Sequence, residues 1–545
     1  MIRYYSLTGG ILLDKYEKVR ANFYDKIDEN AHASTYEGTR DLYYAEPEFT
    51  GKFMDICAHF YERDGDERAL QKGMAVVNSI KNNIRSDGYI GMLGEGNELK
   101  VFSVWNHAFT LYGLTRMYAV TNSIEIKALI IKAADWIVNT FSCDNHPDIL
   151  EAANKGSENI TCFFAMLSAY EATGDKKYLD FVGRIIEYCE STDMNLLSFD
   201  SILKLRSQKG IEMIVVYLGV LKYGILAKNS RAIDAARRYF EEIRLTQIRN
   251  TGNGTIRESW TENGNSPRLM PTEDKPNETC VAVGIIELAL ALFYVLKEAK
   301  YLDVIEKTLL NHMCGSLEKA GSDFAYYQGN WGKKIYRTAG GAYQCCRYRG
   351  FTLFSYLNDM LYHFDGNTLI PMIYSASVFK CGGVICEQTA DYPKSDNIEF
   401  KIKAEHKIVL KLRVPEWCEN YSVTVDGKET QLAAEGGYLM LDLKEGEFFV
   451  SLYLEKKPRI QSHLIDGKEY LSVTYGPMLM THDTHFGGEL WQRLSSDARF
   501  ESADTNGEAI VKLCSDEMTL VDFASAGGND PEKDLYTVFI PKKQL

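Results

Sequence analysis

Apolar residues recur at helical spacing from the start of the chain to about Phe364, with short polar turns between the apolar stretches. FMDICAHFYERDGDERALQKG joins two such stretches through a DGD turn, and LSAYEATGDKKYLDFVGRIIEYC joins two through a GD turn. Apolar residues at i, i+3, i+4 and i+7 mark the buried face of a helix, and Gly and Asp interrupt it. The pattern therefore predicts consecutive helical hairpins.

The hairpins recur at intervals of roughly 50 to 70 residues, which is typical of stacked helical repeats. Each hairpin pairs a strongly apolar helix with an amphipathic helix, so we expect an inner ring wrapped by an outer ring. An open solenoid would use the same hairpins. The chain leaves the helical pattern near Phe364, which favours a closed toroid over residues 1–365.

The pattern changes to period two after HFDGNT. NIEFKIKAEHKIVLKLRVPEW, GYLMLDLKEGEFFVSLYLEKK and YLSVTYGPMLM alternate apolar and polar residues between glycine-containing turns. Strict alternation buries one face of a strand and predicts an antiparallel β-sandwich over residues 366–494. The tail, residues 495–545, is a C-terminal β-rich segment that either completes the sandwich or wraps onto the helical domain.

Charge and composition narrow the classes of partner. The net charge of −14 argues against nucleic acid and against an anionic membrane. No apolar run approaches the roughly 20 residues that span a bilayer, and the first residues lack a signal-peptide pattern, so we expect a cytoplasmic protein without a membrane partner. The 34 tyrosines suit stacking on sugar rings, although tyrosine also fills cores.

A long polar segment separates two of the predicted hairpins. It runs from Arg249 to Pro276, is rich in glycine, and contains Glu258, Glu262 and Glu273. A loop of this length without secondary structure is uncommon inside a compact domain and is usually functional. We therefore expect this loop to carry catalytic or binding residues.

One glutamate and three cysteines stand at the predicted starts of two helices. Glu278 and Cys280 follow the long loop, and Cys345 and Cys346 open another helix about 65 residues later. A carboxylate and three thiolates suffice for a tetrahedral zinc site, and two helix N-termini would favour thiolates. Adjacent cysteines seldom bind one metal, so spacing alone leaves reduced, buried thiols as the alternative.

These motifs, in this order, resemble glycoside hydrolase family 127, which contains β-L-arabinofuranosidases. The resemblance rests on ETC at 278–280 and CC at 345–346, on DGYIGML and WNHAFTLYGL before them, on IEKTLLNHM and FAYYQGNW between them, and on LKLRVPEW, GYLMLDLKEGE and YLSVTYGPM after them. It implies a multidomain fold, with an (α/α)6 barrel as catalytic domain and β-sandwich domains behind it.

The resemblance also implies a retaining hydrolase with a cysteine nucleophile. Cys345 would attack the sugar, and a zinc ion would be held by Glu278, Cys280, Cys345 and Cys346. RESW resembles the acid/base segment of the family and assigns the proton donor to Glu258, whereas a shorter loop alignment assigns it to Glu262. Retention requires this pairing, because a proton donor and a nucleophile must act on opposite faces of the sugar.

Four further positions are candidate sugar contacts. His107, Glu306 and Tyr326 resemble family positions that contact sugar hydroxyls or support the site. Each also has a purely structural interpretation: His107 as an interior histidine, Glu306 as a solvated charge on a helix, and Tyr326 as a core residue. The chain departs from the family after CC, where RYRG places Arg347 and Arg349. Arg347 is therefore expected either to bind the carboxylate of an acidic sugar or to pair with acidic residues at the surface. GSENITC and GIEMIVVYL stand where the family has sugar-binding histidines.

The leading hypothesis is a zinc-dependent retaining glycosidase for a β-L-arabinofuranoside or a related plant sugar, with a homodimer left open. One alternative is a hydrolase or lyase for an acidic or deoxy sugar on the same fold. Another is a non-catalytic carbohydrate-binding protein with structural zinc. A thiol redox protein is disfavoured, because adjacent cysteines form a strained disulfide and the chain has no CxxC motif.

Overall fold

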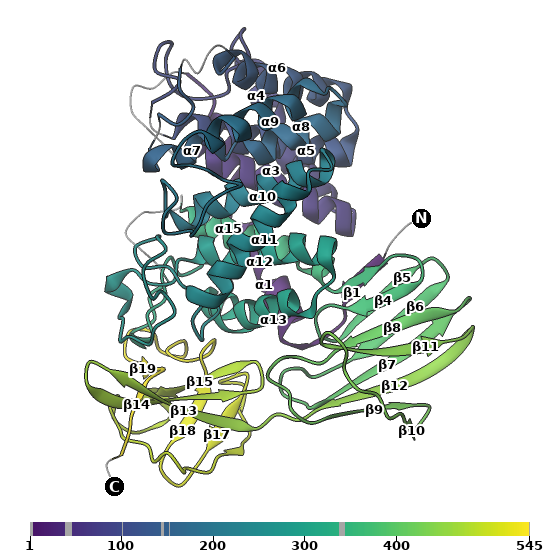
Figure 1. The fold of residues 1–545 in the computed structure, drawn as a ribbon, viewed down its shortest axis with the longest axis vertical. Helices are drawn as coiled ribbons and strands as arrows, with labels where there is room; N and C mark the ends of the chain where they lie inside the picture. Colours follow the sequence, from purple (N-terminus) through teal and green to yellow (C-terminus); the bar gives the residue numbers. More distant parts are fainter. Residues whose placement is uncertain are drawn as a thin grey trace.

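A helical domain and two β domains make up the chain in the computed structural model, which describes residues 4–38, 46–100, 102–142, 147–151, 153–336 and 344–543. The helical domain occupies the upper part of Figure 1, and the two β domains lie beneath it. The helical domain holds the candidate site, and the β domains pack against its lower end.

Six helices form a closed inner ring, in which each packs against the next and the last packs against the first. In ring order they are α3 (Glu46–Asp64), α5 (Ser103–Thr121), α8 (Phe163–Thr173), α10 (Gly210–Leu226), α12 (Thr279–Leu296) and α15 (Cys345–Ser355). Ring neighbours cover both flanks of every inner helix, which is why most residues of these helices are buried. The closed ring confirms the predicted toroid and excludes the open solenoid.

An outer helix covers each inner helix. The outer helices are α1 (Gly10–Lys26), α4 (Glu67–Asn83), α6 (Ile124–Thr140), α9 (Lys177–Glu190), α11 (Ser230–Thr246) and α13 (Ala299–Lys307). Helix α11 buries one stripe, which includes Ala232, Ala236 and Ile243, and leaves its other residues partly or fully exposed. The outer helices are therefore amphipathic, as the sequence pattern predicts.

Short elements complete the helical domain. They are α2 (Glu29–Ser34), α7 (Ser157–Ile160), α14 (Cys314–Ser316), the 3-10 turns η1 (Asn154–Gly156), η2 (Thr272–Asp274), η4 (Leu357–Met360) and η5 (Thr484–Phe486), and the π-helical turn η3 (Thr308–Met313). Of these, η5 belongs to the C-terminal β domain.

Helix α12 has the length and hydropathy of a membrane-spanning helix. Two-thirds of it is buried inside the inner ring, however, and its flanks pack on α10 and α15. Its apolar character is explained by its place in the core of the toroid.

Two sheets form the first β domain. The seven-stranded sheet has the order β1 (Tyr4–Leu7), β5 (Ser377–Cys381), β6 (Val384–Thr389), β7 (Asn397–Ala404), β12 (Gly446–Leu454), β9 (Tyr421–Val425), β10 (Lys428–Glu429). The four-stranded sheet has the order β11 (Tyr438–Leu443), β8 (Ile408–Arg413), β4 (Thr368–Pro371), β3 (Tyr362–Phe364). Strand β7 alternates exposed and buried residues along its length, as period two requires. The N-terminal β1 joins this domain by pairing with β5, so the β domain also uses residues that we assigned to the helical domain.

A third, nine-stranded sheet forms the C-terminal domain. Its strands are β13 (Pro458–Ile465), β14 (Lys468–Tyr475), β15 (Met478–Asp483), β18 (Thr519–Asp522), β17 (Lys512–Cys514) and β16 (Glu501–Ser502), joined by β19 (Tyr536–Thr537), β2 (Trp331–Gly332) and β20 (Ile540–Pro541). Strand pairing therefore divides the β region between β12 and β13 rather than at residue 494. Alternation is the same in both sheets and does not show which sheet a strand joins.

A buried ion pair joins the toroid to the first β domain. Glu306 on α13 is 4% exposed, and Arg413 at the end of β8 is fully buried. Arg413 Nη2 lies 2.6 Å from Glu306 Oε1, and Tyr392 Oη and Trp417 Nε1 donate to the same carboxylate. Arg413 also binds Asp303. The carboxylate of Glu306 thus satisfies three donors across the domain boundary.

Glu306→Gln is expected to destabilise this boundary by about 3 kcal/mol, because it leaves a buried guanidinium short of one carboxylate. Thermal unfolding followed by circular dichroism measures the shift. Glu447→Gln removes an exposed ion pair with Lys403 and serves as the control, with a change close to zero. Equal midpoints for the two variants would show that the boundary does not depend on the buried pair.

Candidate active site

The N-termini of two inner helices meet at one end of the toroid. Glu278 is the N-cap residue of α12, and Cys280 is the second residue of that helix. Cys345 and Cys346 are the first two residues of α15. Because α12 and α15 are neighbours in the ring, residues far apart in the sequence lie side by side. The backbone N–H of Cys280 donates to Cys346 Sγ at 3.4 Å.

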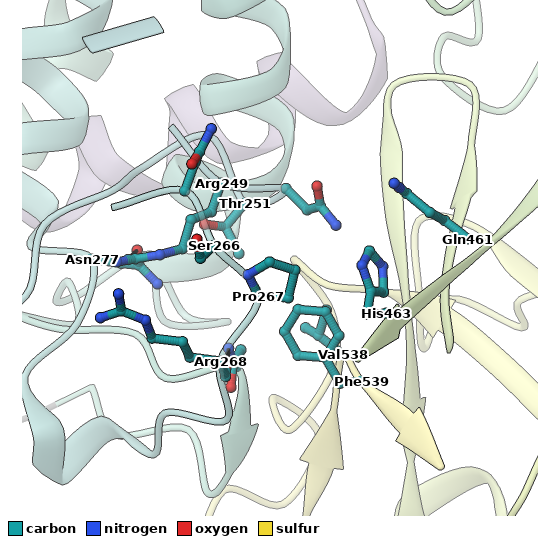
Figure 2. Close-up of a pocket in the computed structure, with 13 residues that line it drawn as sticks. Arg249, Thr251, Ser266, Pro267, Arg268, Asn277, Gln461, His463, Val538 and Phe539 are labelled. Atoms are coloured by element: carbon teal, nitrogen blue, oxygen red, sulfur yellow. Dashed lines mark hydrogen bonds between the residues drawn. The ribbon is translucent and has the colours of Figure 1, made fainter. Parts of the chain in front are cut away.

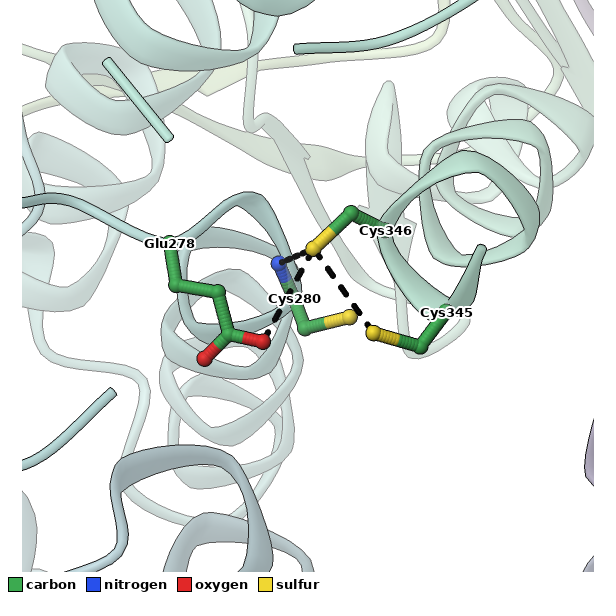
Figure 3. Close-up of side chains that lie close together, drawn as sticks. All are labelled: Glu278, Cys280, Cys345 and Cys346. Carbon is green, nitrogen blue, oxygen red and sulfur yellow. Dashed lines mark hydrogen bonds between the residues drawn. The ribbon is translucent and has the colours of Figure 1, made fainter. Parts of the chain in front are cut away.

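The four side chains converge on one point, as Figure 3 shows. Their ligand atoms all lie within 4.8 Å of one another. Cys346 Sγ lies 3.9 Å from Cys345 Sγ and 3.7 Å from Glu278 Oε1. Ligands of a tetrahedral zinc with Zn–S bonds of about 2.3 Å are separated by about 3.8 Å. The cluster therefore has the spacing and the ligand types to hold one metal ion.

Two observations indicate that the cluster suits a cation. Glu278 is 2% exposed, and its Oε2 has no hydrogen-bond partner among the described residues. Burial raises the pKa of Glu278, Cys280 and Cys346 well above their usual values. Buried anions of this density are costly unless they are paired or coordinate a metal.

Cys345 differs from the other two thiols. Hydrogen bonds from Cys280 and Cys346 lower the pKa of Cys345 well below its usual value, and the Lys52 ammonium adds to this effect. Cys345 is also the one sulfur of the three that is not fully buried. Its Sγ lies 3.2 Å from Tyr326 Oη. The geometry thus makes Cys345 the thiol that ionises first and the one that faces open space.

That open space is a cavity of about 310 Å³ at the end of the ring. Its walls combine aromatic rings, carboxylates and cations around the cluster. The described lining residues outside the cluster are Glu48, Phe49, Lys52, Phe102, Trp105, Phe109, Lys209, Ile211, Glu212, Val215, Glu258, Tyr326, Gln344 and Arg349. Aromatic faces beside charged hydrogen-bonding groups provide what a small polar ring such as a sugar requires.

Glu258 enters this cavity from the long loop. A tight turn from Ile256 to Ser259 holds it, with Arg257 and Glu258 both in the left-handed backbone region at φ 48° and 66°. Side chains rarely adopt this conformation, and such strain concentrates at functional sites. Lys209 and Tyr327 bind the two carboxylate oxygens of Glu258.

Glu262 lies elsewhere. It is exposed and lines a separate surface depression with Leu245 and Asn263. Of the two acids that the loop sequence left open, only Glu258 shares a cavity with Cys345.

Three of the predicted sugar contacts lie outside the cavity. His107 is fully buried, where Ile90 N–H donates to its Nδ1 and its Nε2 bonds Ala133 O, so it is the interior histidine of the alternative interpretation. Glu306 lies at the β-domain boundary described above. Arg347 turns toward Ser322 and Asp323. The sequence pattern did not reveal which way these three side chains point. Tyr326, the fourth predicted contact, does line the cavity.

Two ion pairs place cations in the wall of the cavity, and the sequence interpretation missed the first of them. Lys52 and Glu48, on α3, are 3% and 6% exposed and pair with each other. Arg349, from the RYRG segment, is buried and pairs with Glu287 on α12. The available signal was a Glu and a Lys four residues apart within the otherwise apolar face of EPEFTGKFMDI, since buried charges are rarely found without a partner or a function.

Two buried glutamates occupy the segments that depart from the family. Glu212, in GIEMIVVYL, lines the cavity and accepts hydrogen bonds from Ser157 Oγ at 2.7 Å and Asn154 Nδ2 at 2.6 Å. Burial raises the pKa of Glu212 to about 7. Burial also raises the pKa of Glu158, in GSENITC, to about 9. Buried carboxyl groups with raised pKa values thus stand where family histidines were expected.

Comparison with protein families matches both parts of the chain. A model described as "Beta-L-arabinofuranosidase, GH127 catalytic domain" matches residues 11–359, and the GH127 middle-domain model matches residues 370–447. A non-reducing end β-L-arabinofuranosidase of Bifidobacterium longum subsp. longum is 21% identical, over 92% of this chain and 80% of its own length.

Solved structures with the same fold cover nearly the whole chain. A GH127 β-L-arabinofuranosidase from Geobacillus stearothermophilus T6 superposes with a TM-score of 0.78 at 15% identity, over 99% of this chain and all of its own. BT3674, a GH127 β-arabinofuranosidase, superposes with a TM-score of 0.83 at 18% identity, over 99% and 96% of the two chains. The three-domain arrangement is therefore shared with these proteins.

Cys280→Ala is expected to abolish metal binding, because it removes one of four ligands from the cluster. Elemental analysis after dialysis against a chelator should find about one metal ion per chain in the wild type and close to none in the variant. Cys162→Ala removes a fully buried thiol at the start of α8 and should keep the metal. Equal metal content in the three proteins would exclude Cys280 as a ligand.

Glu212→Gln tests the raised pKa through stability. The pKa of Glu212 is about 7 in the folded protein and 4.5 for an ordinary glutamate, so the folded state binds the proton more tightly. The stability that this proton binding contributes is fully present below pH 4.5 and is lost as the pH rises through 7. The loss is about 3 kcal/mol. The unfolding midpoint of the variant, relative to the wild type, should therefore be higher at pH 8 than at pH 5. Glu187→Gln, at an exposed site on α9, controls for the lost charge. The same difference at both pH values would mean that Glu212 is already ionised at pH 5.

Proposed function

Because the chain belongs to glycoside hydrolase family 127, whose catalytic model spans residues 11–359, we propose that this glycosidase is a retaining hydrolase of β-L-arabinofuranosides with zinc at the Glu278 cluster. The observation that carries the proposal is the shared cavity. The cysteine with the lowered pKa, Cys345, and the one acid of the loop that enters the toroid, Glu258, line the same 310 Å³ space.

The donor set supports zinc as the metal. Glu278, Cys280, Cys345 and Cys346 supply three soft thiolates and one carboxylate, a combination that suits zinc rather than magnesium or calcium. When bound, zinc keeps thiols deprotonated at neutral pH. The orphaned Oε2 of Glu278 is the buried acceptor that such an ion would satisfy.

The protein groups divide the reaction between them. Glu258 donates a proton to the leaving oxygen while Cys345 Sγ attacks the anomeric carbon, so the glycosidic C–O bond breaks as a C–S bond forms. Glu258 then takes a proton from water, whose oxygen displaces the sulfur and restores the thiolate. Two inversions at the same carbon give net retention.

The contacts of Glu258 fix its position. The Lys209 ammonium and the Tyr327 hydroxyl each contact one of its carboxylate oxygens. In the first step the proton must sit on Glu258, so the leaving group has to displace Lys209 or Tyr327 from the carboxylate. We therefore propose Lys209 and Tyr327 as the groups that rearrange when the substrate enters.

The charges of the cavity favour a neutral sugar over an acidic one. Each cation that lines it already has a carboxylate partner: Lys52 has Glu48, Lys209 has Glu258, and Arg349 has Glu287. Arg347, the sequence-based argument for an acidic sugar, is directed toward Asp323. A uronate would find no unpaired cation among the described lining residues. The β-L-arabinofuranoside specificity rests on the curated relative and is proposed from that likeness. A cytoplasmic location and a homodimer remain predictions from the sequence.

Hydrolysis of an aryl β-L-arabinofuranoside tests this function. The wild type should release the aryl group and give arabinose that is initially in the β configuration by proton NMR. Glu258→Gln should lower kcat/KM by about 100- to 10,000-fold, because the step loses its proton donor. Glu262→Gln makes the same change on the exposed side of the loop and should stay within about twofold of the wild type.

Cys345→Ser separates the catalytic proposal from the binding-protein alternative. Turnover should fall at least about 1,000-fold, since the hydroxyl is a far weaker nucleophile than a thiolate. Wild-type turnover by this variant would place the nucleophile elsewhere. Binding of the sugar without turnover by the wild-type protein, with metal present, would support the non-catalytic alternative instead.

A further inference from the structure

A second cavity of the toroid, of about 680 Å³, lies inside the inner ring behind the catalytic cavity. All six inner helices, α3, α5, α8, α10, α12 and α15, contribute lining residues. On α12 these residues lie between Glu287 and Val295, toward the C-terminus, whereas Glu278 and Cys280 stand at the N-terminus. This far cavity therefore occupies the end of the bore opposite the candidate active site.

A wall of side chains separates the two cavities of the bore, because Lys52, Val215 and Arg349 line both. The far cavity has about twice the volume of the catalytic cavity, which is about 310 Å³. A further cavity, of about 320 Å³, lies beside Arg249 and His463, between the long loop and the C-terminal sheet (Figure 2), and shares no described lining residue with either. The far cavity is thus the larger part of one divided bore.

The walls of the far cavity are largely apolar. Phe164, Leu218 and Leu290 line it and are each partly exposed, although most residues of their helices are buried. Ile225 and Tyr294, which also line it, are 48% and 40% exposed. Contiguous apolar surface left open in this way usually marks a binding site. The volume lies within the range of ligand pockets, which is about 300 to 1,000 Å³.

The charged groups of the far cavity already have ionisable partners. The pairs are Lys52 with Glu48, Asp55 with Arg116, Lys222 with Glu171, Glu287 with Arg349, and Asp359 with His59. A charged ligand would lose its hydration against apolar walls and would find no unpaired counter-ion among the described lining residues. The cavity therefore favours a neutral molecule.

One hydroxyl group is available to such a molecule. Tyr112 on α5 lines the far cavity and is partly exposed. Its hydroxyl has no hydrogen-bond partner among the described residues, and it keeps accessible surface. A ligand with one hydroxyl can bond this group and place the rest of its surface on apolar side chains. A sugar would leave most of its hydroxyls without partners against these walls, which is costly.

The aromatic side chains of the far cavity narrow the class of ligand further. The ring centroid of Phe164 lies 5.2 Å from that of Phe109 and 5.1 Å from that of Tyr112. Aromatic rings gain from contact with one another beyond the area that they bury. We propose that the far cavity binds a neutral phenol or aromatic alcohol, with its ring against Phe164, Leu218 and Leu290 and its hydroxyl at Tyr112.

Calorimetric titration of the full-length protein with 2-naphthol tests the proposal. The wild type should bind it saturably, and should bind 2-naphthoate, the same ring with a negative charge, at least about tenfold more weakly. Ala291→Trp, on α12, places an indole in the far cavity and should weaken 2-naphthol binding at least about tenfold, because the ring takes the space of the ligand. Ala433→Trp makes the same change at an exposed site in the first β domain and should bind as the wild type does.

Tyr112→Phe tests the hydrogen bond. This variant should bind 2-naphthol about three- to tenfold more weakly than the wild type, because one hydrogen bond is lost. It should bind naphthalene, which has no hydroxyl, with unchanged affinity. An equal loss for both ligands would mean that packing has changed, and it would overturn the contact assigned to Tyr112.

No saturable binding of 2-naphthol to the wild type, or wild-type affinity in Ala291→Trp, overturns the proposal. Should circular dichroism show that Ala291→Trp does not fold, Leu218→Gln puts a polar group on the wall, and wild-type affinity in that variant overturns the proposal equally. A wild-type dimer in analytical ultracentrifugation that Ala291→Trp dissociates would show that a second copy of the chain covers the far cavity, which overturns the small-molecule site.

Discussion

Helices α12 and α15 pack side by side in the inner ring, and this contact positions the four residues of the candidate metal cluster. It brings two helix N-termini together, so their partial positive charges and free N–H groups face the same sulfur atoms. Glu278, Cys280, Cys345 and Cys346 then lie closer than four ionised groups would tolerate without a cation. The candidate metal cluster therefore depends on the contact between the two helices, and neither helix provides it alone.

The catalytic cavity is built from paired charges. Lys52, Lys209 and Arg349 each contact a carboxylate. The site is therefore polar, and each of these three cations has an anionic partner. Such an arrangement can bind the hydroxyl groups of a neutral sugar and can rearrange its partners as the substrate enters. With a pKa raised to about 7 by burial, Glu212 is only partly ionised at neutral pH.

The β domains brace the toroid at the end away from its amino-terminal hairpins (Figure 1). The first is tied to α13 through Glu306 and Arg413, and the second pairs β19 with β2 of the helical domain.

The sequence by itself determined the architecture of the helical region and the members of the candidate metal cluster. Periodicity of 3.6 and of 2 reports local burial, so the hairpins, their inner and outer helices and the change to strands near Phe364 were readable from the chain. The motifs ETC and CC identified Glu278, Cys280, Cys345 and Cys346, and RESW identified Glu258.

Only the tertiary structure decided which of the remaining residues reach the cavity. His107, Glu306 and Arg347 occupy helices whose periodicity gives a face but not the neighbour across it, and each turned out to serve packing or an ion pair. Lys52, Glu212 and Arg349 entered the cavity for the same reason. The division of the strands between two sheets was equally hidden, because alternation records that one face of a strand is buried and not which sheet buries it.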